Sequence, residues 1–331
     1  MSAASPRGPL VDWVPYLVVP LLAVAMLPAM PFSTWITLTV AGAAMGMMLF
    51  LMACGLTLIF GLMDVLNFAH GAFITIGAYL AVTVLGALPG MAGADSVTLN
   101  LAVLGVAVLA AAVAAGAVGW AFEFVLVRGV YGSHLRQILI TMGGLIVIGQ
   151  LVLALWGPQP LTLAKPATLR GSFLLGGAEI EKYRVVAVIV GLAVFAAMEL
   201  VLKRTRVGLL VRAGVENREM VEALGYRIRR LFVLVFVAGA ALAGIGGVMW
   251  ATYQELVTVS IGGEMTVLVF IVVIIGGLGS VTGCFTGAVL VGLVANYVGF
   301  LWPGLALGSN IALLVVILLW RPRGLFPLGR G

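Results

Sequence analysis

Long apolar stretches follow one another along nearly the whole chain, and they restrict what it can fold into. A helix that crosses a membrane needs about 20 consecutive apolar residues, and ten stretches approach that length. They cover residues 12–32, 36–60, 68–88, 99–125, 135–157, 184–202, 231–254, 265–279, 280–299 and 304–320. Of the 331 residues, 63% are hydrophobic and 9% are charged, too few polar side chains to cover a soluble globule. The sequence therefore predicts an all-α, polytopic integral membrane protein, a single transmembrane domain over residues 1–331 with about eight to ten spans.

Two of these stretches are expected to differ from a simple spanning helix. Residues 265–279 are short and run into three glycines, so we expect a broken or re-entrant helix there. These glycines are Gly276, Gly277 and Gly279. Residues 12–32 form an extra N-terminal stretch that resembles a signal peptide, but prolines interrupt it and no clean cleavage site follows. We therefore expect a retained first helix.

The distribution of Lys and Arg predicts which loops face the cytoplasm. Cytoplasmic loops of membrane proteins are enriched in these residues, and residues 203–230 hold eight of them. Placing this loop in the cytoplasm puts both termini there and the loop 158–183 outside, with 14 of the 18 Lys and Arg residues on the cytoplasmic side. Topology thus explains the net charge of +6, and no nucleic-acid partner is expected.

The outer loop 158–183 contains a turn signal. Gly176 and Gly177 separate two short runs of alternating side chains, which favours a short extracytoplasmic β-hairpin. An irregular loop is the alternative.

The sequence offers little for metal binding or catalysis. It has two histidines and two cysteines, with no Cys-x-x-Cys pair and no histidine cluster, so no metal site is expected. It has no Gly-Lys dipeptide and hence no phosphate-binding loop of the Walker A type. No group of acid, base and nucleophile converges, which argues against an enzyme. A stand-alone secondary transporter or channel would need ion-coupling carboxylates in mid-span, and none stands out.

A polar segment interrupts the apolar pattern at residues 61–71. It contains Asp64, Asn67 and His70 between Gly61 and Gly71. Polar groups at membrane depth are costly unless they are paired or line a wet cavity, and glycines let a helix break there. One interpretation is therefore the lining or hinge of a translocation path. The other is a polar connection at the cytoplasmic surface, with Asp64 or Asn67 capping the next helix.

A second informative segment lies in the basic loop 203–230. We expect one short amphipathic helix from Arg212 to Leu224, because Ala213, Met220 and Leu224 share one face by their spacing. Gly225 stands where a helix ends. The other residues assigned to this helix are Glu219, Glu222 and Ala223. Its apolar stripe would dock either against a soluble partner, as a coupling element, or in the lipid interface.

Several runs together carry a family resemblance. They are residues 55–61, 66–71 with 77–79, 212–225, 240–248, 276–280 and 321–326. Among them, Leu-Asn-Phe-Ala-His-Gly at 66–71 and Gly-Gly-Leu-Gly-Ser at 276–280 are specific in combination. On these runs the chain resembles the inner-membrane permease subunits of bacterial branched-chain amino acid ABC importers, the LivH type. The coupling loop of such importers has the pattern Glu-Ala-Ala, with a glycine four residues after the second alanine. Glu222-Ala223 meets this pattern only loosely, because Leu224 and Gly225 follow it directly.

The resemblance implies a division of labour within the bacterial inner membrane. An extracytoplasmic binding protein would deliver a branched-chain or related hydrophobic amino acid, and this chain would form the path with a second related permease or a second copy of itself. Two ABC ATPase subunits would dock on residues 203–230 and hold ATP and Mg²⁺, so this chain would bind no cofactor. Permeases for urea or short amides have a similar pattern and remain the alternative. Gly276, Gly277 and Gly279 would belong to the path or its hinges.

Overall fold

The computed structural model describes residues 9–216 and 218–327. Seven of its helices are long and apolar enough to cross a membrane. They are α2 (Phe32–Met63), α3 (His70–Ala87), α5 (Val97–Val125), α6 (His134–Trp156), α7 (Lys182–Arg204), α10 (Ile228–Gln254) and α12 (Val281–Leu301). Three shorter apolar helices are α1 (Pro9–Ala25), α11 (Ile261–Gly276) and α13 (Ala306–Trp320). Each of the ten predicted stretches thus corresponds to a helix in the described part of the chain, which confirms the all-α polytopic class.

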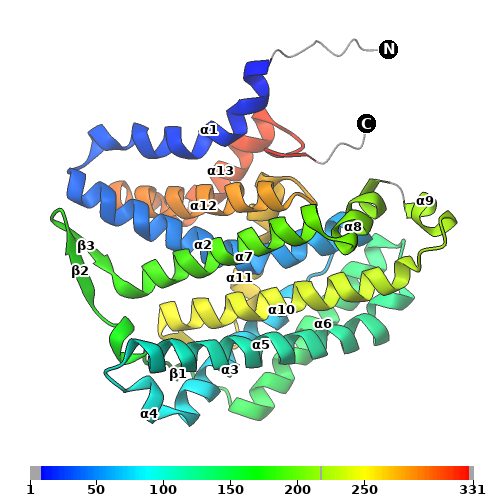
Figure 1. The fold of residues 1–331 in the computed structure, drawn as a ribbon, viewed down its shortest axis with the longest axis horizontal. Coiled ribbons are helices and arrows are strands. Elements are labelled where there is room, and N and C mark those ends of the chain that lie inside the picture. The colour runs from blue at the N-terminus through cyan, green and yellow to red at the C-terminus, as the bar shows by residue number, and fades with distance from the viewer. Residues whose placement is uncertain (1–8, 217, 328–331) are drawn as a thin grey trace.

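The helices run side by side around a central α2 (Figure 1). Helix α2 packs on α12, α10 and α7, and α10 also packs on α3 and α5. Nearly every residue of α2 from Ala41 to Met63 is buried, as expected for a helix that is apolar all round. The outward faces of α5, α6 and α7 carry exposed Leu, Val and Ile side chains, the surface that a lipid bilayer would cover.

Close approach of the central helices depends on small residues. A side chain at Gly42 would meet Leu293 Cα of α12 at 2.8 Å, and one at Gly46 would meet Val289 Cα at 2.7 Å. Small residues spaced four apart permit this kind of contact between membrane helices. The α2–α12 contact therefore tolerates no larger residue at these two positions.

One end of the bundle carries the predicted β-hairpin. Strands β2 (Ser172–Leu175) and β3 (Ala178–Glu181) pair antiparallel, and the turn residues Gly176 and Gly177 have φ values of 59° and 82°. Positive φ at both positions matches a two-residue hairpin turn, so the hairpin is confirmed. Two further short strands, β1 (Leu161–Thr162) and β4 (Leu256–Val257), pair nearby. A short helix, α4 (Pro89–Ala92), precedes α5. We call this the hairpin end of the bundle.

The opposite end carries α8 (Arg206–Glu216) and α9 (Arg218–Ala223) (Figure 1). The sequence predicts a helix from Arg212 to Leu224, but the helical residues begin earlier, at Arg206, and end at Ala223. Residue 217, between α8 and α9, lies outside the described residues. Helix α8 begins earlier because Thr205 Oγ1 accepts a hydrogen bond from Gly208 N at 3.1 Å, which caps its first turn. We call this the α9 end.

Gly225 closes α9 as predicted. It has φ 85°, its N–H donates to Glu222 O at 2.9 Å, and Tyr226 N–H donates to Val221 O at 3.3 Å. This pair of hydrogen bonds is the Schellman arrangement, which requires a left-handed residue just past the helix. The three residues predicted to share one face differ in burial. Ala213 packs against the core, whereas Met220 and Leu224 are 58% and 69% exposed.

Candidate functional site

The polar segment 61–71 is a break between two helices. Helix α2 ends at Met63, Asp64 adopts a left-handed conformation with φ 53°, and α3 begins at His70. The residues between them are not helical. A left-handed conformation is uncommon for a non-glycine residue, and Asp is among those that tolerate it best. Asp64 therefore sets the direction in which the chain leaves α2.

The chain then turns back into the bundle. The Nε2–H of His70 donates to Met52 O at 2.7 Å, and Met52 lies about 16 Å before the end of α2 at the usual helical rise. The Phe68 ring lies 4.9 Å from the Phe270 ring of α11. Gly71 packs on the backbone of Gly262, at the start of α11. The segment thus runs inside the protein between α2 and α11, not as a connection on its surface.

Two polar side chains of α6 satisfy the backbone of this non-helical segment. Leu66 N–H donates to Gln137 Oε1 at 3.4 Å, and Phe68 N–H donates to Thr141 Oγ1 at 3.1 Å. Gln137 and Thr141 are both completely buried. Non-helical backbone at membrane depth is tolerated only where such partners exist. Sequence reasoning missed these two residues, although their spacing of four within the apolar stretch 135–157 was the available signal.

Asn67 and His70 carry buried polar atoms without partners. Both side chains are completely buried. Neither the oxygen nor the nitrogen of the Asn67 amide, nor Nδ1 of His70, has a hydrogen-bond partner among the described residues. An unsatisfied buried polar group costs about 1–3 kcal/mol. Asn67 does not cap α3 either, because the residue before that helix is Ala69 and no side chain caps it.

Asp64 lies at the rim of the break. Its Oδ2 is 3.7 Å from Nε2 of His134, and both side chains are about half exposed. An exposed pair of this kind contributes little to stability. Asp64 is therefore partly exposed, whereas Asn67 and His70 are buried, although all three belong to the polar segment 61–71.

The second glycine-rich break lies close to the first. Helix α11 ends at Gly276, Gly277 and Gly279 have φ values of 101° and 85°, and α12 begins at Val281. A side chain at Gly61 would meet Gly279 Cα at 2.6 Å. The C-terminal segment holds this break from the other side, since Leu325 N–H donates to Ile275 O and Phe326 N–H donates to Gly276 O. The structure thus brings Gly61, near the end of α2, against Gly279 of the glycine-rich turn.

A recess joins this region to α8. Its volume is about 630 Å³, and residues of α2, α7, α8 and the glycine-rich turn line it, including Gly61, Gly279 and Arg212. Glu199, also in its lining, pairs with Lys203 and accepts a hydrogen bond from Thr282 Oγ1. The predicted residues Glu219, Glu222, Ala223 and Leu224 are exposed on or beside α9 and lie outside the break itself.

The chain is similar to known transport proteins over most of its length. Residues 38–320 match the family described as branched-chain amino acid transport system / permease component. The high-affinity branched-chain amino acid transport system permease protein LivH of Escherichia coli K12 is 30% identical over 296 residues, covering 87% of this chain and 94% of LivH. The corresponding protein BraD of Pseudomonas aeruginosa is 30% identical, with 88% and 94% covered.

A more distant relative is the permease protein LivM of Salmonella typhimurium. It is 26% identical over 314 residues, covering 87% of this chain and 70% of LivM. No solved structure matches the chain significantly. The matches to LivH and BraD confirm the predicted resemblance.

Proposed function

Because the chain belongs to the family of branched-chain amino acid transport permease components, we propose that it is the membrane subunit of an ATP-binding-cassette importer. In this proposal it carries branched-chain or related hydrophobic amino acids into the cytoplasm of a bacterium. An extracytoplasmic binding protein delivers the amino acid at the hairpin end. Two ATPase subunits act from the α9 end, where they bind ATP and Mg²⁺. The high density of Lys and Arg between residues 203 and 230 supports a cytoplasmic α9 end.

The path requires a second permease chain. The similarity of this chain to both LivH and LivM, two permease proteins of different name, supports a pair of related subunits. A second copy of this chain is the other arrangement. In either case, the exposed apolar faces of the bundle would be shared between the partner and the bilayer.

The observation that carries the proposal is the segment 64–69, which enters the bundle with both polar atoms of the Asn67 amide unpartnered among the described residues. His70 follows it at the start of α3, and its Nδ1 has no partner there either. Unwound segments of this kind line the pathway in other transporter folds. We place both side chains on the path or at its hinge. When the segment moves, the Asn67 amide gains a partner, either water or the polar end of the amino acid. Burying the Asn67 amide without a partner costs free energy in the present conformation, so this cost favours the conformation in which the segment has moved.

The α9 end supplies the coupling in this proposal. Met220 and Leu224 present exposed apolar side chains to an ATPase subunit, and Glu219 and Glu222 present charges beside them. Movement of α8 then reaches Gly61 and Gly279 across the recess that Arg212 lines. Gly276, Gly277 and Gly279 act as the hinge on the side of α11, and Asp64 and Gly71 act on the side of α3.

A permease for urea or short amides is the second candidate. One observation favours it: the Asn67 side chain offers an amide donor and an amide acceptor that no described residue uses. Such groups match the hydrogen-bonding edges of urea better than the side chain of leucine.

Reconstitution tests both candidates. The chain is purified with its partner subunits, inserted into proteoliposomes with the binding protein, and assayed for ATP-dependent uptake of labelled leucine and labelled urea. We expect leucine uptake, and we expect the double variant Asn67→Ala, His70→Ala to assemble normally but to lose most of it. ATP-dependent uptake of urea without leucine uptake would favour the second candidate. Normal leucine uptake by the double variant would remove Asn67 and His70 from the path.

A further inference from the structure

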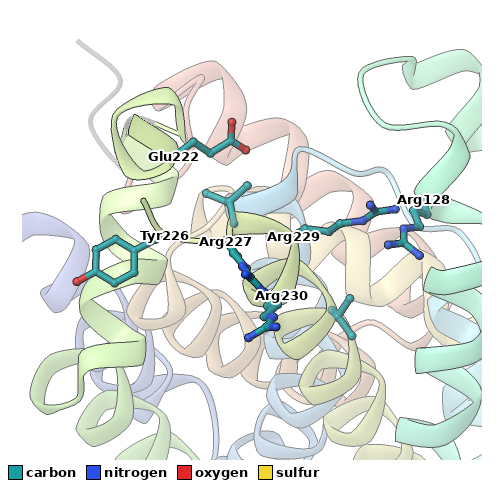
Figure 2. Close-up of a pocket in the computed structure, with 8 residues that line it drawn as sticks. Arg128, Glu222, Tyr226, Arg227, Arg229 and Arg230 are labelled. Carbon is teal, nitrogen blue, oxygen red and sulfur yellow. The ribbon is translucent and has the colours of Figure 1, made fainter. Parts of the chain in front are cut away.

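A recess rich in arginine opens at the α9 end, apart from the breaks at 64–69 and 277–280. Its volume is about 480 Å³. Four arginines line it: Arg128 on the short helix η2 (Val127–Gly129), Arg227 just before α10, and Arg229 and Arg230 on the first turn of α10. The remaining lining residues are Glu222, Tyr226, Ile228 and Val233. Figure 2 shows the side chains of Arg128 and Arg229 extending toward one another across the recess.

These arginines have little negative charge around them. Glu222 is the one acidic residue in the lining, and none of the four arginines forms an ion pair with a residue that the structure describes. Nε of Arg128 is buried without a hydrogen-bond partner in the described part of the chain. Glu123, close to Arg128 in sequence, instead accepts a hydrogen bond from the Tyr131 hydroxyl at 2.5 Å. An anion in the recess would relieve the repulsion among the four guanidinium groups.

The backbone adds to this preference for an anion. Helix α10 starts at Ile228, inside the recess, and runs for 27 residues. The N-terminus of a helix carries a partial positive charge and amide N–H groups that are not used within the helix. Guanidinium groups also match phosphate oxygens in pairs, which an ammonium group cannot do. The chemistry therefore fits an anion that presents paired oxygen acceptors, such as a phosphate group.

The surroundings indicate that the phosphate belongs to a lipid. The Arg128 guanidinium lies 5.0 Å from the centre of the Phe124 ring, and Phe124 stacks on Trp120 at 5.8 Å. Phe124 and Trp120 are each about half exposed on the outer face of α5, and Leu234 of α10 is 48% exposed. Tryptophan and arginine gather where membrane helices meet the headgroups, with apolar side chains beyond them along the acyl chains.

We propose that this recess binds the headgroup phosphate of an anionic phospholipid, with the acyl chains lying along Trp120 and Phe124. Basic recesses between membrane helices bind anionic headgroups in this way. The site does not depend on which substrate the permease carries. Glu222 and Tyr226 border both the recess and α9, so a bound lipid would also stabilise the link between α9 and α10.

The test measures lipid retention by the whole complex. The chain and its partner subunits are placed in nanodiscs of phosphatidylcholine alone or of equal parts phosphatidylcholine and phosphatidylglycerol, and retained phosphatidylglycerol is counted by native mass spectrometry. We expect wild-type protein to retain phosphatidylglycerol and Arg128→Gln, Arg229→Gln to bind it roughly tenfold more weakly or worse. The matched control Arg204→Gln, Arg206→Gln removes the same charge from exposed positions at the α7–α8 junction and should retain it.

Three outcomes would overturn the proposal. The first is equal retention by wild-type and Arg128→Gln, Arg229→Gln protein. The second is displacement of the lipid by millimolar inorganic phosphate, which would indicate a site for the free ion. The third is loss of the ATPase subunits in the arginine variant with unchanged lipid retention, which would assign the recess to a protein contact. If the glutamine variant does not assemble, Arg128→Lys, Arg229→Lys keeps the charge, and weakened retention is still expected because the paired hydrogen bonds are lost.

Discussion

Asn67 and Asn100 are both buried asparagines, but they differ in what surrounds them. The Asn100 amide donates to Met91 O and Ala94 O and accepts from the N–H and hydroxyl of Thr168, so its hydrogen bonds fix the loop at the hairpin end. Neither polar atom of the Asn67 side chain has a partner in the described residues. The comparison separates an asparagine that holds the structure from one whose burial no described hydrogen bond explains, as expected for the path residue proposed above.

This difference predicts opposite effects of the same substitution. Asn67→Leu removes no hydrogen bond and fills a similar volume, so the free energy of unfolding should stay constant or rise. Uptake should fall roughly tenfold if the amide contributes one hydrogen bond of about 1.4 kcal/mol to the permeating state. Asn100→Leu should instead lower the free energy of unfolding by about 1–3 kcal/mol or more. Denaturation in detergent measures the stability of each variant, and proteoliposomes measure its uptake. A destabilised Asn67→Leu protein with normal uptake would show that Asn67 is structural and does not act in transport.

Lys165 predicts how the hairpin end responds to pH. Its Nζ lies 2.5 Å from Glu181 Oε1 at the end of β3 and 3.1 Å from Glu255 Oε1 after α10. Burial by itself lowers the pKa of Lys165, but the hydrogen bonds and charges of Glu181 and Glu255 outweigh burial and leave that pKa above the ordinary lysine value.

Because the pKa is higher in the folded state, the stabilisation is fully present below the ordinary lysine pKa and is lost as pH rises through the raised value. Hydrogen exchange of residues 172–181 should therefore accelerate only at strongly alkaline pH, beyond the intrinsic increase. Lys165→Met should show the fast exchange already at neutral pH. An unchanged exchange rate in Lys165→Met would mean that β-pairing alone holds the hairpin.

At the scale of elements, α6 stabilises a segment that has no regular structure of its own. Gln137 and Thr141 provide acceptors for two backbone N–H groups of the segment 64–69. Gln137→Leu should leave the Leu66 N–H without a partner and cost about 1–3 kcal/mol in the free energy of unfolding. Gln150→Leu, on the outer face of the same helix, is the control and should be nearly neutral. Thermal denaturation of the two variants decides whether α6 has this role.

Helix α9 is the element on which coupling is expected to depend. Leu224→Asp changes an exposed side chain, so the fold should tolerate it, yet it should weaken ATPase binding or uncouple ATP hydrolysis from uptake. Burying one leucine contributes about 1.5–3 kcal/mol at an interface. Leu174→Asp changes an equally exposed leucine on the hairpin and should leave the ATPase bound. Pull-down of the ATPase subunits compares the Leu224→Asp and Leu174→Asp variants. Normal ATPase binding and normal coupling in Leu224→Asp would favour the interpretation that this segment lies in the lipid interface.

At the scale of the whole molecule, the sequence predicts what depends on neighbours along the chain. The ten apolar stretches and the Gly176-Gly177 hairpin follow from composition and local turn chemistry, and both are confirmed. The re-entry of the segment 64–69 depends on contacts with α6 and α11, which lie far away in the sequence. Likewise, Thr205 caps the first turn of α8, whereas the apolar spacing predicted a helix that begins only at Arg212. Long-range partners of this kind leave little trace in a single sequence.

The distance between the hairpin and α9 makes the orientation of the whole molecule testable. The two lie at opposite ends of the bundle (Figure 1), and the Lys and Arg distribution predicts that the hairpin is outside and α9 is inside. Single cysteines are introduced as Leu174→Cys and Leu224→Cys, both at exposed positions, in a background without Cys54 and Cys284, which are buried. A membrane-impermeant maleimide added to intact cells should label position 174 and reach position 224 only after the membrane is opened. Labelling of position 224 alone in intact cells would invert the topology, and the ATPase site proposed at α9 would then be on the wrong side of the membrane.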